Sequence, residues 1–322
     1  MTCENCGREY GCIEGIPDLR VEVPSWIDFE DDLQLARSLA ARKDASAAEL
    51  LHEVFSRRAE WNSERVSLRT QQVLDAPKRL DRDVQEWLEP KLKAGQPFLD
   101  VGCGPGALLC AAVHRGHQGL GVDVSMTWLI IAQRMVRAHG GTSTFAAAAG
   151  EALPLRDGAV TTVVSLDVIE HVNDMPGLAA EIDRVTAPGG AAIISTPNRF
   201  SLTAEPHVGV WGVGLLPRPW QAPFVRWRSG LTYTNTRLLS SFGLRRLLRR
   251  STTMQFRLAI PETPPEEIAR FSPLKAGFAR LYNIIRLYPP LRPIFLVIAP
   301  FFRAEGLKAW IISVVGGGLG FP

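Results

Sequence analysis

The chain has 322 residues, of which 46% are hydrophobic and 21% are charged, and its formal net charge is +3. This length and hydrophobic content suffice to bury a full α/β core. The net charge is too small to indicate a nucleic-acid partner, and we expect none. The N-terminus lacks the basic and apolar regions of a signal peptide. A cytoplasmic, reducing location is therefore predicted, in which the five cysteines are thiols or metal ligands rather than disulfides.

The N-terminal segment contains a CxxC pair, Cys3 and Cys6. Together with Gly15-Ile-Pro-Asp-Leu-Arg20, it resembles the second half of a small zinc-ribbon domain. A closed structural zinc site needs four ligands, and the further candidates are Cys12 and the remote His52. Three interpretations stay open: a ribbon that has lost its metal, zinc held with another chain or an unusual ligand, and a chain that begins after the first CxxC. We assign no metal ligand.

Helical periodicity follows in a charged stretch of the chain. Apolar residues recur at three- and four-residue spacings in Glu49–Phe55 and again in Val66–Leu74, which predicts amphipathic helices. Three side chains here, Trp61, Arg65 and Arg69, either line a substrate cleft or belong to packed and solvated helix faces.

A glycine-rich turn is the most informative feature of the chain. An apolar run that starts at Phe98 leads into Gly102, Gly104 and Gly106, and a second short apolar run ends in Asp123. Glycines after a strand let backbone N–H groups approach a ligand closely, and an acid about twenty residues further on is placed to accept the hydroxyls of a ribose. The GxGxG spacing and the lack of a following lysine fit neither a dinucleotide site nor a P-loop.

The segment Asp100-Val-Gly-Cys-Gly-Pro-Gly106 resembles the first motif of the class I S-adenosylmethionine-dependent methyltransferases. Three further segments match this family in order. Gly150–Leu155 resembles the segment that contacts adenine, Val160–Leu166 has the composition of a strand buried on both faces, and Asp167–Val172 resembles the motif after that strand. The resemblance covers roughly residues 80–260.

This resemblance implies an α/β, Rossmann-like fold: a seven-stranded, mostly parallel sheet with helices on both faces. It also implies S-adenosyl-L-methionine as the cofactor. Two positions depart from the family pattern, since Ala149 stands where an acid commonly contacts adenine and Thr161 where an aspartate commonly opens the strand. The residues that the resemblance assigns to cofactor binding are Asp100, Gly102, Cys103, Gly104, Gly106, Asp123, Val124, Gly150, Glu151, Leu166 and Asp167.

Two histidines are candidates for catalysis. His171 follows the fourth strand on the side where acceptors approach, and a neutral imidazole can take a hydroxyl proton near neutral pH. Its alternative role is that of a helix-start histidine bonded to the backbone. His207 is the second candidate for catalysis or substrate contact. Asp167, Glu170 and His171 also resemble the metal-assisted pattern of quinone-biosynthesis O-methyltransferases, but metal-free relatives share the motif and we assign no metal site.

A long insertion, residues 199–232, is rich in aromatic residues and proline. Loops of this length in a compact domain are usually lids or binding segments, so we expect it either to select the substrate or to form a lid that packs on its own tryptophans. After it, Ser240 predicts the start of a helix with Leu244 and Leu248 on one face. The arginines of this helix either face solvent or meet anionic lipid headgroups.

Apolar residues are concentrated again near the C-terminus. The runs Ile294–Phe302 and Trp310–Val315 are each far shorter than the roughly 20 residues that span a bilayer. Three roles stay open for this tail: packing on the catalytic domain, a homodimer interface, and contact with a membrane surface.

The predicted organisation is one catalytic domain with additions: a partial ribbon at 1–23, a helical cap at 24–90, a methyltransferase domain at 91–260 with a lid at 199–232, and a hydrophobic extension at 261–322. The predicted reaction is methyl transfer to a hydroxyl, or to an amine, of a small or lipid-like metabolite. The alternative is a catalytically weak, cofactor-binding partner subunit that acts through its ribbon and tail. The glycine spacing disfavours a dehydrogenase.

Overall fold

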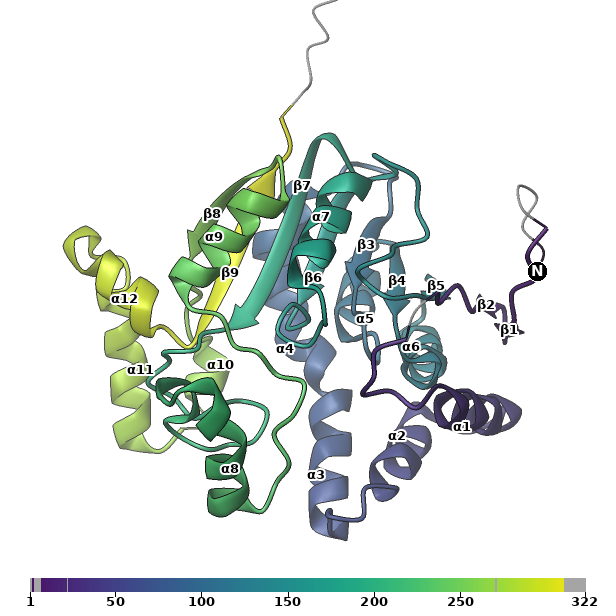
Figure 1. Cartoon of the computed structure of the whole chain (residues 1–322), viewed down its shortest axis with the longest axis horizontal. Helices are drawn as coiled ribbons and strands as arrows, with labels where there is room; N and C mark the ends of the chain where they lie inside the picture. Colours follow the sequence, from purple (N-terminus) through teal and green to yellow (C-terminus); the bar gives the residue numbers. More distant parts are fainter. Residues whose placement is uncertain (1, 3–6, 22, 270, 310–322) are drawn as a thin grey trace, which may run out of the picture.

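The computed structural model describes residues 2, 7–21, 23–269 and 271–309. At its centre is a seven-stranded sheet (Figure 1). Its strands are β3 (Phe98–Val101), β4 (Gly119–Asp123), β5 (Thr144–Ala147), β6 (Val160–Leu166), β7 (Thr186–Pro197), β8 (Gln255–Ala259) and β9 (Phe301–Leu307). The strand order is β5-β4-β3-β6-β7-β9-β8; β9 is antiparallel to both β7 and β8, and the other adjacent pairs are parallel. The predicted Rossmann-like fold, mostly parallel, is confirmed.

Helices cover both faces of the sheet. Side chains alternate along β7, so that Ile193 joins one hydrophobic cluster and Ile194 the other. The first cluster contains residues of α5 (Ala107–His114) and α6 (Met126–Ala138), and the second contains residues of α7 (Met175–Val185) and α9 (Ser241–Ser251). Burial on both faces agrees with the absence of charged residues from β6 and β7.

The helices before the sheet pack on the α6 side. They are α1 (Phe29–Ala41), α2 (Ala47–Ser56), α3 (Ser63–Leu74) and α4 (Ala76–Asp83), followed by η1 (Val84–Leu88) and η2 (Glu89–Lys91). The two predicted amphipathic stretches lie in α2 and α3. A capping box starts α2, because Ser46 accepts from the backbone N–H of Glu49 and Glu49 accepts from that of Ser46. The apolar faces of α1 and α2 join the first cluster.

The ribbon-like segment forms a short antiparallel pair, β1 (Cys12–Ile13) and β2 (Ile16–Pro17). The chain then runs parallel to β5 through a bridge between Asp18 and Ala147. Cys12 is exposed and forms no disulfide. Cys3 and Cys6 lie outside the described residues, so the zinc ribbon stays a prediction.

The predicted boundary at residue 260 is wrong for the sheet. β9 lies beyond it and is hydrogen-bonded between β7 and β8, so the sheet ends only at Leu307. The apolar run Ile294–Phe302 is not one element, because Pro300 separates a helix from β9, whose Phe302 fills the core. The second apolar run, Trp310–Val315, lies outside the described residues.

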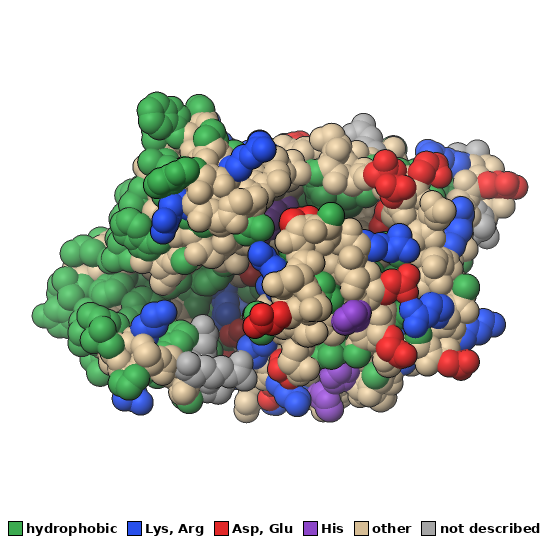
Figure 2. Space-filling model, turned by 90° about the horizontal axis from the view of Figure 1, so that it is seen from below, with side chains coloured by type: hydrophobic (Ala, Val, Ile, Leu, Met, Phe, Trp, Pro, Cys, Tyr) green, Lys and Arg blue, Asp and Glu red, His purple; other side chains and the backbone are tan. Residues whose placement is uncertain are grey.

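Short helices surround the sheet on the β8 side. They are η3 (Val213–Leu215), α8 (Arg218–Ser229), α10 (Pro265–Ile268), α11 (Pro273–Ile285), η4 (Pro289–Leu291) and α12 (Arg292–Ile298). The insertion 199–232 contains η3 and α8. Seen from below, hydrophobic side chains gather at the left-hand end of the molecule, whereas acidic side chains lie in the other half (Figure 2). Among the described residues, no helix combines the length and the apolar character needed to cross a membrane.

Candidate functional site

The glycine turn lies at the carboxyl end of β3, as predicted. Gly102, Gly104 and Gly106 have φ angles of +72°, +49° and +80°, which favour glycine. A Cβ at Gly102 would lie 2.3 Å from Cγ2 of Val168, whereas a Cβ at Gly104 would meet nothing within 4 Å. The backbone at Gly104 is therefore open on the side where a side chain would stand. Gly106 is the N-cap residue of α5.

Asp123 ends β4 and faces this turn. One carboxylate oxygen accepts from the backbone N–H of Gly104 at 2.8 Å and the other from that of Ser125 at 2.9 Å. Burial raises the pKa of Asp123, although these backbone hydrogen bonds oppose the shift. The neighbouring Asp100 is buried in β3, and burial together with the charge of Asp123 raises the pKa of Asp100 to about 8. At neutral pH, Asp100 is therefore protonated while the cofactor is absent.

Two other residues predicted to bind the cofactor, Cys103 and Val124, have contacts within the protein itself. Cys103 is buried, and burial raises the pKa of its thiol, which makes it an unreactive packing residue. Val124 presents its carbonyl oxygen to the guanidinium of Arg20, which donates to it at 3.0 Å. The sequence interpretation did not anticipate this contact from the N-terminal segment.

Arg20 belongs to a buried polar cluster that holds the N-terminal segment and α1 against the end of β4. Its guanidinium donates to Asp18 at 2.7 Å and to Asp32 at 2.8 Å. Asp32 also accepts from the hydroxyl of Ser125 at 2.7 Å and from the backbone N–H of Met126 at 2.9 Å. Asp32 thereby caps the first turn of α6, directly after Asp123. The acidic first turn of α1 was visible in the sequence, but not its partner.

The segment after β5 lies at the same edge of the sheet. Gly150 packs closely, since a Cβ there would lie 2.8 Å from Cδ1 of Leu178. The carboxylate of Glu151 accepts from the backbone N–H groups of Asn173 at 3.1 Å and Asp174 at 3.4 Å. Glu151 thus joins the loop after β5 to the loop before α7. Ala149 is buried, as its small side chain allows.

Asp167 comes directly after Leu166, the last residue of β6. Its φ of 55° is unusual for a residue with a side chain. The Ser195 hydroxyl donates to its carboxylate at 2.9 Å. Burial raises the pKa of Asp167, and this hydrogen bond and the nearby histidines oppose the shift. By accessible surface Asp167 is exposed, and a residue in this rare backbone conformation at the end of a strand is typical of functional positions.

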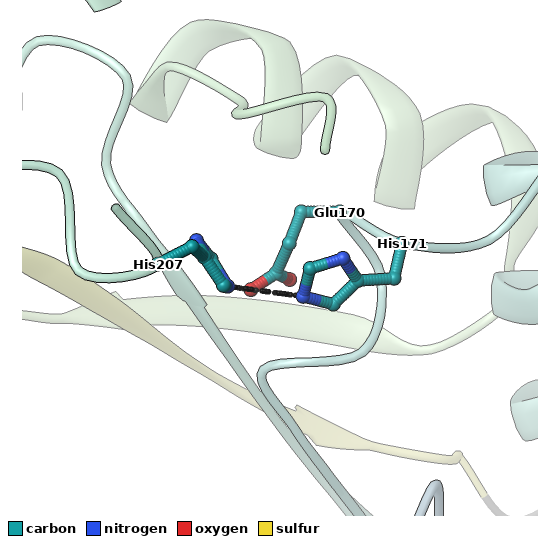
Figure 3. Close-up of side chains that lie close together, drawn as sticks. All are labelled: Glu170, His171 and His207. Carbon is teal, nitrogen blue, oxygen red and sulfur yellow. Dashed lines mark hydrogen bonds and ion pairs between the residues drawn. The ribbon is translucent and has the colours of Figure 1, made fainter. Parts of the chain in front are cut away.

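Glu170, His171 and His207 lie together beyond Asp167 (Figure 3). The Nε2 atoms of the two histidines lie 3.0 Å apart. Glu170 Oε1 lies 4.0 Å from Nε2 of His171 and 3.9 Å from Nε2 of His207. The other oxygen of Glu170 accepts from the hydroxyl of Thr196 at 2.9 Å, whereas Oε1 is buried without a hydrogen-bond partner. The structure thus brings the two predicted catalytic histidines into contact.

The hydrogen bonds assign the protons of both rings. His171 Nδ1 lies 3.0 Å from the carbonyl oxygen of Asn235, which only accepts, so Nδ1 carries the proton and Nε2 of the neutral ring carries a lone pair. His207 Nδ1 faces the carboxylate of Glu205. Because His207 then faces an acceptor on each side, it donates from both nitrogens and is an imidazolium.

The pKa shifts agree with this assignment. Burial lowers the pKa of His171, and the positive charge of His207 adds to the effect. Burial also lowers the pKa of His207, but the hydrogen bond and charge of Glu205 outweigh it, and the net shift is upward. Burial, with the charge of Asp167, raises the pKa of Glu170 to about 8. A neutral base thus lies beside a cationic donor.

The donor set of Glu170, His171 and His207 also fits a divalent cation. One ligand atom from each lies within 4.8 Å of the others. Two imidazoles and one carboxylate are a common ligand set for divalent transition metals. The buried Glu170 Oε1 without a partner is the observation that favours a cation, since such an oxygen is costly to bury. The sequence interpretation assigned no metal site, and only the fold of the insertion completes this set.

Comparison with known proteins agrees with the predicted resemblance. A family model described as a methyltransferase domain matches residues 99–194. An uncharacterized methyltransferase of Mycobacterium avium (strain 104) is 42% identical over 102 residues, which are 32% of this chain and 40% of the relative. The ubiquinone biosynthesis O-methyltransferase of Methylococcus capsulatus is 36% identical over 107 residues, 33% of this chain and 45% of the relative. The chain thus spans less than half the length of these curated relatives.

Among solved structures, phosphoethanolamine N-methyltransferase 2 of Haemonchus contortus, in complex with S-adenosyl-L-methionine, has a TM-score of 0.49 and 17% identity, covering 80% of this chain and 60% of that one. The family match and the curated relatives, with the sheet and the glycine turn described above, identify the fold as that of the class I S-adenosylmethionine-dependent methyltransferases. His207, Glu205 and the rest of the insertion lie outside this match.

Proposed function

We propose that this protein transfers the methyl group of S-adenosyl-L-methionine to a hydroxyl oxygen of a small or lipid-like metabolite. The observation that carries the proposal is the contact between His171 and His207, which places a neutral imidazole and an imidazolium at the end of β6. Oxygen acceptors need a base for the hydroxyl proton, and the Nε2 lone pair of His171 can supply one once an acceptor hydroxyl replaces the His207 N–H that points at it.

The cofactor is expected at the carboxyl ends of β3, β4 and β5. The open backbone at Gly104 lies against the cofactor in this arrangement, and Asp123 accepts the ribose hydroxyls, as in other nucleotide sites with an acid at this strand tip. The segment around Gly150 forms a wall of the adenine site. Asp100 lies in β3, just before the glycine turn, and burial keeps its carboxyl group protonated.

The protein's own part in the reaction is alignment and proton transfer. The sulfonium of the bound cofactor supplies an activated methyl group. An acceptor hydroxyl would replace the direct contact between the two Nε2 atoms, which requires the two rings to move apart, and would donate its proton to Nε2 of His171 as its oxygen takes the methyl group. His207, held by Glu205, donates a hydrogen bond to the same oxygen and stabilises its developing negative charge. Positioning and general-base catalysis together account for large rate enhancements.

A metal-assisted variant of this reaction is favoured by the buried Oε1 of Glu170. Glu170, His171 and His207 would hold a divalent cation, which when bound supplies Lewis-acid polarisation of an acceptor oxygen. In the metal-assisted reaction, His171 and His207 act as ligands of the cation. Substitution of either histidine then abolishes cation binding as well as turnover.

Calorimetric titration with S-adenosyl-L-methionine and with its demethylated product tests the cofactor site. We expect micromolar binding that is lost in Asp123→Ala and kept in Asp44→Ala, an exposed acid that leaves the site untouched. Transfer of labelled methyl groups to hydroxylated aromatic, sugar and lipid acceptors then tests the reaction. A folded protein that binds neither form of the cofactor would overturn the proposal.

A further inference from the structure

The molecule has a second surface feature, an apolar and basic face formed by α8, α11 and the turn after α11. We propose that this docking face binds the surface of a bilayer that contains anionic lipids. The inference does not depend on methyl transfer, since none of the residues that carry it belongs to the site described above.

Helix α11 presents an apolar stripe to solvent. Leu274, Phe278 and Leu281 follow one another at four- and three-residue spacings and are 73%, 65% and 50% exposed. The opposite side of the helix holds it to the protein, because Asn283 exchanges hydrogen bonds with the backbone of Thr263, and Ala276 is buried. The stripe is therefore the free side of a helix whose other side is already packed.

The apolar surface continues past the end of α11. Ile284, Leu287 and Tyr288 are 70%, 68% and 58% exposed. A soluble monomer rarely leaves so many large apolar side chains together in solvent, so this surface has a partner. Hydrophobic side chains cover the left-hand end of the molecule in the view from below (Figure 2).

Helix α8 adds tryptophans to the same end of the molecule. Trp220 and Trp227 are 67% and 76% exposed, and Trp211, just before the helix, is 60% exposed. Tryptophan is the residue most typical of the boundary between lipid and water. Between the α8 side chains lies an open hollow of about 500 Å³, lined by Leu216, Pro219, Trp220, Pro223, Phe224 and Trp227. The insertion is joined to α12 through the Leu202 N–H, which donates to the Ile298 carbonyl.

Charge decides the nature of the partner. Residues 206–261 contain nine arginines and no acidic residue, and residues 268–304 contain five arginines, one lysine and no acidic residue. The whole range 206–304 has 15 basic and 3 acidic residues, whereas the rest of the chain has 21 basic and 30 acidic ones. Although the net charge of the whole chain is small, residues 206–304 are therefore strongly basic.

The basic residues flank the apolar ones. Arg226 and Arg228 are exposed near the end of α8, and the guanidinium of Arg228 lies over the ring of Trp227. Lys275 and Arg280 lie on the two flanks of the α11 stripe and are exposed. An apolar stripe bordered by cations, with tryptophans beside it, is the pattern of a helix that lies in the interface of an anionic membrane.

A second copy of this chain is a less suitable occupant. A homodimer through the docking face would bring two strongly basic surfaces together without acidic residues to pair with them, and like charges in contact oppose association. A bilayer with anionic headgroups supplies the missing negative charge and accepts the apolar side chains at once.

Vesicle sedimentation tests the proposal with the full chain. We expect the protein to pellet with vesicles of phosphatidylcholine and phosphatidylglycerol, and to remain in solution with phosphatidylcholine alone or at high salt. Leu274→Ser/Phe278→Ser/Leu281→Ser should reduce the partition coefficient by at least about tenfold, because it removes the apolar area that inserts. The control Leu68→Ser/Leu307→Ser removes exposed leucines elsewhere and should leave partition unchanged.

The electrostatic part is tested by a matched pair of charge variants. Arg226→Gln/Arg228→Gln on the docking face should lower partition into anionic vesicles on the order of tenfold, and Arg245→Gln/Arg249→Gln on α9 should have a clearly smaller effect. Circular dichroism and the melting temperature establish that the variants are folded. Equal losses from both pairs, a wild-type protein that ignores anionic vesicles, or a dimer dispersed by the α11 substitutions in sedimentation velocity would overturn the proposal.

Discussion

The Nε2 atoms of His171 and His207 lie 3.0 Å apart, although 36 positions separate the two residues in the chain. His171 is held from one side by the Asn235 carbonyl and His207 from the other side by Glu205. The planes of the two rings are nearly perpendicular. This pairing joins a family motif at the end of β6 to an insertion that the family model does not cover.

The pH dependence of turnover follows from this pair. Because burial lowers the pKa of His171, its base form persists below the ordinary histidine value of about 6.5. We expect the acid limb of kcat/KM to lie below that value. In His207→Gln the nearby positive charge is absent, so the pKa of His171 should rise and the acid limb should move to higher pH. The pH–rate profiles of the two proteins are the measurement.

His171→Gln keeps a hydrogen-bonding side chain but removes the base, and should lower kcat by about 10²- to 10⁴-fold. The control is His114→Gln, a histidine of α5 away from the site, which should turn over normally. A His171→Gln protein that keeps full activity toward its acceptor would show that the base lies elsewhere.

The sequence predicted the cofactor half of the site better than the acceptor half, for a physical reason. The glycine turn and Asp123 are set by local geometry, since a strand, a tight turn and the tip of the next strand follow one another within the same βαβ unit. The meeting of His207 with Glu170 depends on how a 34-residue insertion folds back across the sheet edge. No local periodicity encodes that path, so His207 was predicted as a candidate without its partners.

The misplaced domain boundary has a related cause. β9 pairs with β7 and β8, which lie far away in sequence, and its apolar residues directly follow those of α12. In the sequence, α12 and β9 form one hydrophobic run. Only the pairing of β9 with β7 and β8 shows that the second part of this run is a strand. Asp32 shows the same limit, since its partners Ser125 and Met126 lie more than ninety residues away.

Two alanine substitutions should separate the fold from the cofactor site. Gly104→Ala meets no neighbouring atom, so it should cost only about 1–2 kcal/mol for its left-handed backbone while it weakens S-adenosyl-L-methionine binding by blocking the turn. Gly102→Ala would place its Cβ 2.3 Å from Val168 and should destabilise the fold as well. Urea unfolding and cofactor titration of both variants distinguish the two effects. Gly104→Ala with unchanged affinity would contradict the proposed backbone contact.

Asp100 makes stability depend on pH in the direction opposite to an ion-paired acid. Its pKa is about 8 in the folded protein and about 4 when unfolded, so the native state holds the proton that the unfolded chain releases. The contribution of Asp100 to the free energy of unfolding is fully present below about pH 4 and is lost as pH rises toward 8. We expect Asp100→Asn to be more stable than the wild type at about pH 8, by at least about 1 kcal/mol, and similar at pH 4.

Glu170 titrates over the same range, with a pKa of about 8, and therefore serves as an internal comparison. Asp100→Asn and Glu170→Gln should each remove part of the decline in the free energy of unfolding as pH rises. The double variant should remove most of this decline. Urea unfolding at several pH values, without cofactor, measures these slopes. A decline that Asp100→Asn leaves unchanged would show that Asp100 ionises normally.

A divalent cation should stabilise the wild-type protein if Glu170, His171 and His207 hold it as ligands. We expect Zn²⁺ or Mn²⁺ to raise the melting temperature of the wild type through binding to the native state alone, and to leave His207→Gln unaffected. His52→Gln, an exposed histidine of α2, is the control that should respond like the wild type. No cation-dependent shift in the wild type would leave the two histidines as a metal-free proton-transfer pair.

Asp32 is expected to control cofactor affinity without touching the cofactor. It accepts from the Ser125 hydroxyl, from the Met126 N–H and from Arg20, whose side chain is fully buried. Asp32→Asn leaves that buried guanidinium without part of its negative counterpart and weakens the cap of α6. The free energy of unfolding should fall by about 3–5 kcal/mol, as is typical when one partner of a buried ion pair is removed.

Because α6 starts at Met126, three residues after Asp123, loosening its first turn should also disturb the Asp123 carboxylate, which we propose accepts the ribose hydroxyls. We expect the affinity for S-adenosyl-L-methionine to drop on the order of tenfold, which corresponds to about 1.4 kcal/mol. Asp31→Asn is the matched control, because Asp31 is exposed in the same turn of α1. If Asp32→Asn lost stability but bound the cofactor like the wild type, the α1 contact would support the fold alone, and Asp123 would keep its orientation without it.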